Sequence, residues 1–190
     1  PGSDVDLMIL IEDMALETRR SGLENFLAFL WDIGLEVGHS VRTVEDCARE
    51  GAADITVATS LMEARLLIGP LALFKQMRAV TGPNRIWPDA AFFESKQKER
   101  YQRCHKYNET AFNLEPNIKD GPGGLRDFHM IVWVAKRHFG TSTLQELVNH
   151  GFLNLSEYDE LIECRNFLWQ LRFALHTLTG RREDNLLFDH

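Results

Sequence analysis

The chain has 190 residues, with 28 acidic and 21 basic side chains and therefore a formal net charge of -7. This length fits one domain or two small ones, and a hydrophobic content of 44% is enough for a packed core, which argues against global disorder. The acidic balance argues against a protein that binds nucleic-acid polymers or anionic membranes, because those ligands require a basic face. Three scattered cysteines, no C-x-x-C pair and no signal-like or membrane-spanning segment are typical of a cytoplasmic protein.

The beginning of the chain has the pattern of a mixed α/β unit. An apolar, β-branched run over residues 5–11 predicts a buried strand, followed by a helix with apolar residues at helical spacing. Residues 35–42 then alternate like a strand with one polar face. Two more helices are expected to begin at Thr43 and Asp54, whose side chains can cap them, and the second is expected to continue to Gly69.

Breakers separate this unit from a helical one. Glycine, proline and asparagine between residues 82 and 88 predict an elbow, so we expect an α/β core over residues 1–81 and a helical domain over residues 82–190, with a cleft between them. The predicted fold class is therefore α+β. Four aromatic residues of the predicted helices are expected in the core: Trp133, Phe167, Trp169 and Phe173.

The most informative stretch is Gly-Ser-Asp-Val-Asp at residues 2–6. Side chains alternate along a strand, so Asp4 and Asp6 are expected to point to the same face. Two adjacent carboxylates repel each other unless a positive charge lies between them, and Mg²⁺ prefers such oxygen ligands together with substrate phosphates. The pair therefore predicts a Mg²⁺ site, which Mn²⁺ could also occupy; the alternative is two exposed acids at the entrance of a strand.

A third carboxylate usually completes a site of this kind, and two residues compete for the role. Glu36 shares a strand face with Gly38 and Ser40, so a neighbouring strand could bring it to the aspartates. Asp54 is the other candidate, although a helix N-cap is the better explanation for it. His39 could serve as a base for a hydroxyl group, but alternation turns it away from Glu36, which favours a core position.

Several residues could contact phosphate groups. Arg42 and Arg65 each carry a guanidinium that matches phosphate oxygens, with an ion pair as the alternative. Gly123 and Gly124 directly precede a predicted helix, where free backbone N–H groups and the helix dipole would attract an anion, and Arg126 adds a positive charge. Asp127 could complement the helix dipole or orient Arg126. The alternative for this second element is a tight turn that packs the helical domain on the α/β unit.

These motifs together resemble a known family. Gly-Ser-Asp-x-Asp entering an apolar strand looks like the metal-binding strand of DNA polymerase β-type nucleotidyltransferases. Segments along the whole chain resemble the bacterial PII uridylyltransferase/uridylyl-removing enzymes: residues 35–43, 54–59, 63–67, 113–116, 121–127, 137–140 and 172–176. The related glutamine synthetase adenylyltransferases share the D-x-D and a Gly-Gly-x-Arg-acid element but lack the sequence Gly-His-Ser-Val-Arg-Thr found at residues 38–43.

The resemblance implies a function. The family transfers UMP from UTP to a tyrosine hydroxyl of the PII signal protein and releases pyrophosphate. Membership would imply that Asp4 and Asp6 bind Mg²⁺ and that Asp4, Asp6 and Glu36 are catalytic. It would also imply a set of residues that contact the nucleotide. The nucleotide contacts implied are Ser3, Arg42, Gly123, Gly124 and Arg126. Family members also remove UMP through a His-Asp domain and sense glutamine through C-terminal modules, and neither signature occurs here.

The chain departs from the family pattern at its start. The family carries a Gly-Gly-Tyr-Gly-Arg-Gly-Glu stretch before the equivalent of Gly2, and this sequence opens at Pro1, so we expect a fragment that lacks part of the triphosphate site. Two alternatives to uridylyl transfer stay open at this point. One is adenylyl transfer to glutamine synthetase, and the other is a catalytically silent helical scaffold or sensor.

Overall fold

A computed structural model describes residues 5–12, 16–107, 114–140 and 143–189. The chain forms two compact units that divide between Pro88 and Asp89, and each is described by itself below. Helices dominate both units, and a two-stranded parallel sheet lies in the first, in agreement with the α+β class. Among the described residues, no helix combines the length and the apolar character needed to cross a membrane.

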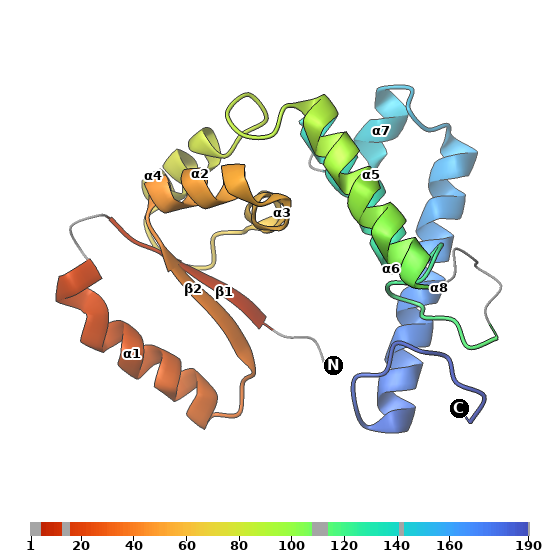
Figure 1. Ribbon diagram of the computed structural model, residues 1–190, viewed down its shortest axis with the longest axis horizontal. Helices are drawn as coiled ribbons and strands as arrows, with labels where there is room; N and C mark the ends of the chain where they lie inside the picture. Colours follow the sequence, from red (N-terminus) through yellow and green to blue (C-terminus); the bar gives the residue numbers. More distant parts are fainter. Residues whose placement is uncertain (1–4, 13–15, 108–113, 141–142, 190) are drawn as a thin grey trace. The chain divides into compact units, whose positions relative to one another are not determined.

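The first unit contains a parallel strand pair with helices on both sides. Its elements, in chain order, are β1 (Val5–Leu10), α1 (Leu16–Asp32), β2 (Val37–Arg42), α2 (Val44–Ala53), α3 (Ile55–Glu63) and α4 (Leu71–Val80). The strands pair in register from Val5↔Val37 to Leu10↔Arg42. In Figure 1, α1 lies on one side of the strand pair and α2, α3 and α4 lie on the other.

The core of this unit lies between the strands and α2–α4. Cys47, Leu61 and Met77 are almost fully buried, and Met8 and Leu10 of β1 pack against them. Because strand side chains alternate, Asp6 shares the face of Met8 and Leu10. The strand predicted over residues 5–11 is confirmed as β1, but this strand is less buried than predicted, since Val5 is 48% exposed.

Local capping signals in the first unit are confirmed. The Thr43 hydroxyl accepts a hydrogen bond from the Asp46 N–H at 3.0 Å, and the Asp46 carboxylate accepts one from the Thr43 N–H at 3.1 Å, which completes a capping box. The Asp54 side chain accepts from the Thr56 N–H at 2.6 Å and starts α3. Both helices therefore begin where the sequence predicts.

The end of α3 differs from the prediction, because the helix stops at Glu63 and does not reach Gly69. The Arg78 guanidinium donates to the carbonyl oxygens of Leu61 and Met62 at 3.1 and 2.9 Å, and so satisfies the last turn. Arg78 lies on α4, a helix that the sequence analysis did not predict.

The elbow segment belongs to the first unit. Ile86 is buried, and the Trp87 indole N–H donates to the Gly51 carbonyl oxygen at 2.7 Å. Residues 82–88 therefore pack back onto α2, and the division between the units falls later along the chain than residue 81.

The second unit is helical. It contains α5 (Asp89–Lys106), α6 (Leu125–Phe139), α7 (Gln145–Asn149) and α8 (Leu155–Thr179), and a tail of residues 180–189. Helix α6 contacts both α5 and α8, and the short α7 packs on α8. An isolated antiparallel bridge, Asn117↔Asn185, joins the loop before α6 to the tail.

The core of the second unit includes two cationic side chains. Phe92, Leu125 and Leu147 are nearly inaccessible to solvent. Lys96, 4% exposed, lies 4.7 Å from the centre of the Trp133 ring, and the Arg137 guanidinium lies 5.4 Å from the centre of the Phe92 ring. Burial lowers the pKa of the Arg137 guanidinium. Aromatic faces thus provide part of the electrostatic compensation that these buried charges require.

Three of the four aromatic residues predicted in the core lie at the surface. Phe167 is 63% exposed, Phe173 57% and Trp169 43%, whereas Trp133 is partly buried beneath Lys96. The prediction for α8 was wrong: within the described residues, α6 and α7 pack against this helix but leave these three side chains exposed. An apolar stripe shows that a helix has a face to bury, but it does not show what covers that face.

Candidate functional site

The strand pair of the first unit positions Asp6. Its register partner is Gly38, and a Cβ built at Gly38 would lie 3.0 Å from Asp6 Oδ1. The carboxylate therefore occupies space that any other residue at position 38 would fill. Asp6 is exposed, and no hydrogen bond or ion pair joins it to another described residue. A carboxylate held on a strand and open to solvent is suited to bind a cation.

Glu36 lies beside this aspartate along the neighbouring strand. Its carbonyl oxygen accepts a hydrogen bond from the Val5 N–H at 3.2 Å, which extends the β1–β2 ladder to the residue before Val37. Two positions separate Glu36 from Gly38, so both share the face of Asp6. Asp54, the competing acid, uses one carboxylate oxygen to cap α3.

Of the two aspartates predicted to bind a divalent cation, only Asp6 lies within the described residues. Ser3 and Asp4 lie outside the described residues, so their predicted roles stay predictions. Within the described parts of the chain, no group of three or more His, Cys, Asp or Glu side chains is placed to hold a metal ion. The Mg²⁺ site predicted from Asp4 and Asp6 therefore stays a prediction, to which Asp6 contributes one exposed carboxylate, since Mg²⁺ keeps several waters and takes few protein ligands.

The other predicted residues of the first unit have different surroundings. Arg42 forms an ion pair with Glu50, Nε to Oε2 at 2.9 Å, while Arg65 is exposed in the segment after α3. His39 is also exposed and does not lie in the core; its ring packs edge-on against Trp31 of α1, with the ring centres 5.7 Å apart. Alternation turns His39 away from the face of Glu36, as expected, but α1 covers the ring only in part, so the core position predicted for it was wrong.

The glycine-rich segment before α6 is a tightly folded loop. A Cβ at Gly124 would lie 2.9 Å from three carbonyl oxygens, those of Gly121, Ile118 and Lys119. The Gly123 N–H donates to Asp127 Oδ2 at 2.9 Å, and the N–H groups of residues 124–127 donate to backbone carbonyls of the same loop at 2.9–3.1 Å. The free N–H groups expected at this helix start are therefore absent from residues 123–127.

Asp127 and Asp120 organise the arginines around this loop. Asp127 Oδ1 accepts from Arg100 Nε at 3.2 Å and from the Arg103 guanidinium, so it orients two arginines of α5 and not Arg126. Arg126 lies 3.4 Å from Asp120 instead. The sequence analysis missed Arg100 and Arg103; their spacing of three places them on one face of a predicted helix, but no local pattern marks Asp127 as their partner.

Asp184 of the tail forms a second charged centre that the sequence analysis missed. Its Oδ1 accepts from Arg172 Nε at 2.6 Å and lies 3.3 Å from His176 Nε2, while Lys119 Nζ is 3.8 Å from Oδ2. Burial alone would raise the pKa of Asp184, but Arg172, His176 and Lys119 together outweigh it, so this pKa lies below its ordinary value. No local pattern marks Asp184, because its partners lie on other segments.

The comparison with known protein families decides the affiliation. A family model described as GlnD PII-uridylyltransferase matches residues 91–190, which is more than half of the chain. The chain belongs to the GlnD PII-uridylyltransferase family. The resemblance inferred from the sequence is thereby confirmed. No solved structure matches the chain.

Relatives of this uridylyltransferase-family chain match both of its units. A protein of Nitrosococcus oceani is 53% identical over 190 residues, all of this chain, and one of Methylococcus capsulatus is 53% identical over 188 residues, 99% of it. A protein of Ectopseudomonas mendocina is also 53% identical over 190 residues. Each is named bifunctional uridylyltransferase/uridylyl-removing enzyme, and the chain spans 21% of the length of each.

Proposed function

We propose that this chain is part of an enzyme that transfers UMP from UTP to a tyrosine hydroxyl of the PII signal protein, in response to nitrogen status. The names of the relatives support the reaction class, and the placement of Asp6 over Gly38 is the observation in this chain that supports it most directly. In this reaction the tyrosine oxygen attacks the α-phosphorus of UTP, the bond to the pyrophosphate oxygen breaks, and the phenolic proton is lost.

Mg²⁺, bound by Asp6 together with Asp4, would neutralise the triphosphate and stabilise charge on the attacking and leaving oxygens. The backbone ladder between β1 and β2 fixes the position of Asp6, and the absence of a side chain at Gly38 leaves room beside the Asp6 carboxylate, which supports a cation-binding role. Glu36 is proposed as the third acid, because strand alternation places it on the face of Asp6. A rigid strand favours precise positioning, on which in-line phosphoryl transfer depends.

The glycine-rich loop of the second unit is proposed to contact the nucleotide through its side chains. Arg126 is 41% exposed and has a single long contact with Asp120 among the described residues, so it retains N–H donors for phosphate oxygens. Gly123 and Gly124 would then act by shaping the loop that carries Arg126, since their own N–H groups already have partners. Arg42 and Ser3 remain proposed nucleotide contacts from the first unit.

Further parts of the proposal rest on the family alone. They are a DNA polymerase β-type architecture for the first unit followed by a helical bundle, a cytoplasmic location, and regulation by glutamine through other parts of the enzyme. The parallel strand pair flanked by helices supports the first of these, since a nucleotidyltransferase core of this type begins with a metal-binding strand.

The test is the conservative change Asp6→Asn in the full-length protein. Loss of the charge removes a metal ligand, so we expect the rate of UMP transfer from UTP to purified PII to fall by about 100-fold or more. Asp32→Asn is the matched control, because Asp32 is an exposed acid at the end of α1. A transfer rate for Asp6→Asn within about twofold of that of Asp32→Asn would reject the proposed role.

The same assay shows whether UTP or ATP is the nucleotide donor. Wild-type protein incubated with labelled UTP or labelled ATP should label PII from UTP. Preferred labelling of a target protein from ATP would favour an adenylyltransferase instead.

A further inference from the structure

Helix α8 carries an apolar stripe that the second unit leaves exposed. Phe167, Leu171, Ala174 and Leu178 follow one another at intervals of four, three and four residues, and so lie on one face of the helix. Phe167 is 63% exposed and Leu178 is 65% exposed. Helix α8 faces the core of the unit with its buried residues Leu175 and His176. The stripe lies on another face of the helix.

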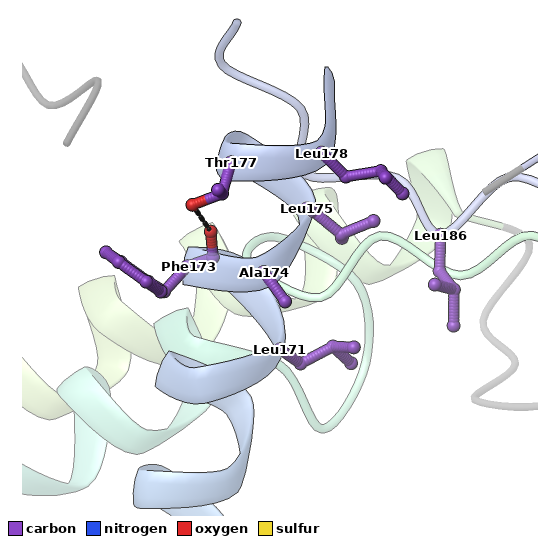
Figure 2. A pocket seen from close by; sticks show the side chains of 7 residues that line it. All are labelled: Leu171, Phe173, Ala174, Leu175, Thr177, Leu178 and Leu186. Carbon is purple, nitrogen blue, oxygen red and sulfur yellow. Dashed lines mark hydrogen bonds between the residues drawn. The ribbon is translucent and has the colours of Figure 1, made fainter. Parts of the chain in front are cut away.

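Three residues of the stripe, Leu171, Ala174 and Leu178, line a groove. A cavity of about 500 Å³ lies along the last turns of α8, and Leu186 of the tail closes it from the other side. Figure 2 shows the side chains of Leu171, Leu175 and Leu178 pointing toward the side where Leu186 lies, whereas Phe173 points away from it. The hydroxyl of Thr177, the polar side chain of the lining, donates to the Phe173 carbonyl oxygen at 2.9 Å. The groove therefore offers apolar surface and no unsatisfied side-chain hydroxyl.

The wall formed by the tail is held in place. The Leu186 N–H donates to the Pro116 carbonyl oxygen at 2.9 Å, and the Asn117 amide donates to the Asn185 side chain at 2.9 Å. Asp184, two residues before Leu186, is anchored to Arg172 of α8 itself. The groove is thus formed before anything binds to it, which lowers the entropic cost of occupying it.

We propose that an apolar segment of the same polypeptide, from the part of the full-length protein outside these 190 residues, fills this groove. The proposal rests on family membership and not on the proposed reaction. Relatives are so much longer that the chain spans 21% of their length, so most of a family member's polypeptide lies outside the two units described here. A contiguous apolar stripe on a soluble helix marks a surface that another element covers.

The size of the groove argues against a second copy of the chain as the occupant. A stable dimer usually buries about 800 Å² on each partner, whereas a groove of this volume accepts a few side chains. A tethered segment needs no such area, because its effective concentration is on the order of millimolar and it does not lose the translational freedom of a separate molecule.

The test measures the reactivity of cysteines placed in the groove of the full-length protein. Cys104 and Cys164 are first replaced by serine; Cys47 is buried and stays. Leu178→Cys and Ala174→Cys are the probes, and Ser156→Cys, an exposed polar position at the start of α8, is the control. Two probes are used because Leu178→Cys removes part of the apolar surface itself.

We expect both probes to react with a thiol reagent roughly tenfold or more slowly than the control, at the same rate over roughly a hundredfold dilution of the protein. Rates equal to that of the control would overturn the proposal, because the groove would then be open. Protection that disappears on dilution would assign the groove to a second copy. Protection that appears only when PII is added would assign it to that protein, and either result would also overturn the proposal.

Discussion

The first unit holds its candidate carboxylate by backbone pairing, whereas the second unit holds its acids inside groups of basic side chains. Asp6 lies on β1 beside Gly38 and has no charged partner among the described residues. Asp127 contacts Arg100 and Arg103, and Asp184 contacts Arg172 and Lys119. An acid surrounded by arginines stabilises the structure around it, while an exposed acid on a rigid strand stays available for a ligand.

The largest expected change would break the second unit's glycine-rich loop. Gly124→Ala places a Cβ against three carbonyl oxygens at 2.9 Å, and backbone atoms cannot move aside cheaply. We expect the free energy of opening of residues 117–127, measured by hydrogen exchange on the full-length protein, to fall by about 3 kcal/mol. The matched control is Gly123→Ala, where φ is +76° but no atom lies within 4 Å. It should cost about 1 kcal/mol, and equal costs at the two positions would contradict the close packing assigned to Gly124.

A smaller change sharpens the role of acids in the second unit. Asp184→Asn keeps the shape but removes the charge that Arg172, His176 and Lys119 share. We expect hydrogen exchange near neutral pH to show a loss of about 2 kcal/mol in the stability of the tail and of the loop before α6, since hydrogen bonds to charged groups contribute about that much.

The pH dependence of this effect has a definite sign. The pKa of Asp184 is lowered in the folded state, so its contribution is fully present above the ordinary aspartate pKa and is lost as the pH falls through the lowered value. Wild type and Asp184→Asn should therefore converge in stability under strongly acidic conditions. A difference that grows as the pH falls would show that the sign is wrong.

The smallest expected change in stability tests the first unit. Gly38→Ala puts a Cβ 3.0 Å from Asp6 Oδ1, and the carboxylate can turn away, so the stability should change by less than about 1 kcal/mol. The displaced carboxylate should nevertheless lower UMP transfer roughly tenfold, because a shift of this size disturbs the alignment of reacting groups. Gly22→Ala, on α1 with no atom within 4 Å, is the control and should leave transfer unchanged. Normal transfer by Gly38→Ala would argue that Asp6 lies outside the reaction site.

The sequence predicted those features of fold and site whose causes are local. The helix starts at Thr43 and Asp54 depend on atoms two or three residues away, and both appear where expected. The shared face of Asp6, Gly38 and Glu36 follows from strand alternation once the strands pair in parallel. The end of α3 could not be predicted in this way, because Arg78, which caps it, lies on another helix.

The sequence by itself determined the family, the α+β class and the starts of α2 and α3, since family motifs and helix caps depend on residues close together in the chain. Only the tertiary structure decided which acids are engaged: Asp127 with Arg100 and Arg103, and Asp184 with Arg172. It also decided that the aromatic residues of α8 lie at the surface. These outcomes depend on contacts between segments far apart in the chain, and a one-dimensional pattern carries no record of which segments meet.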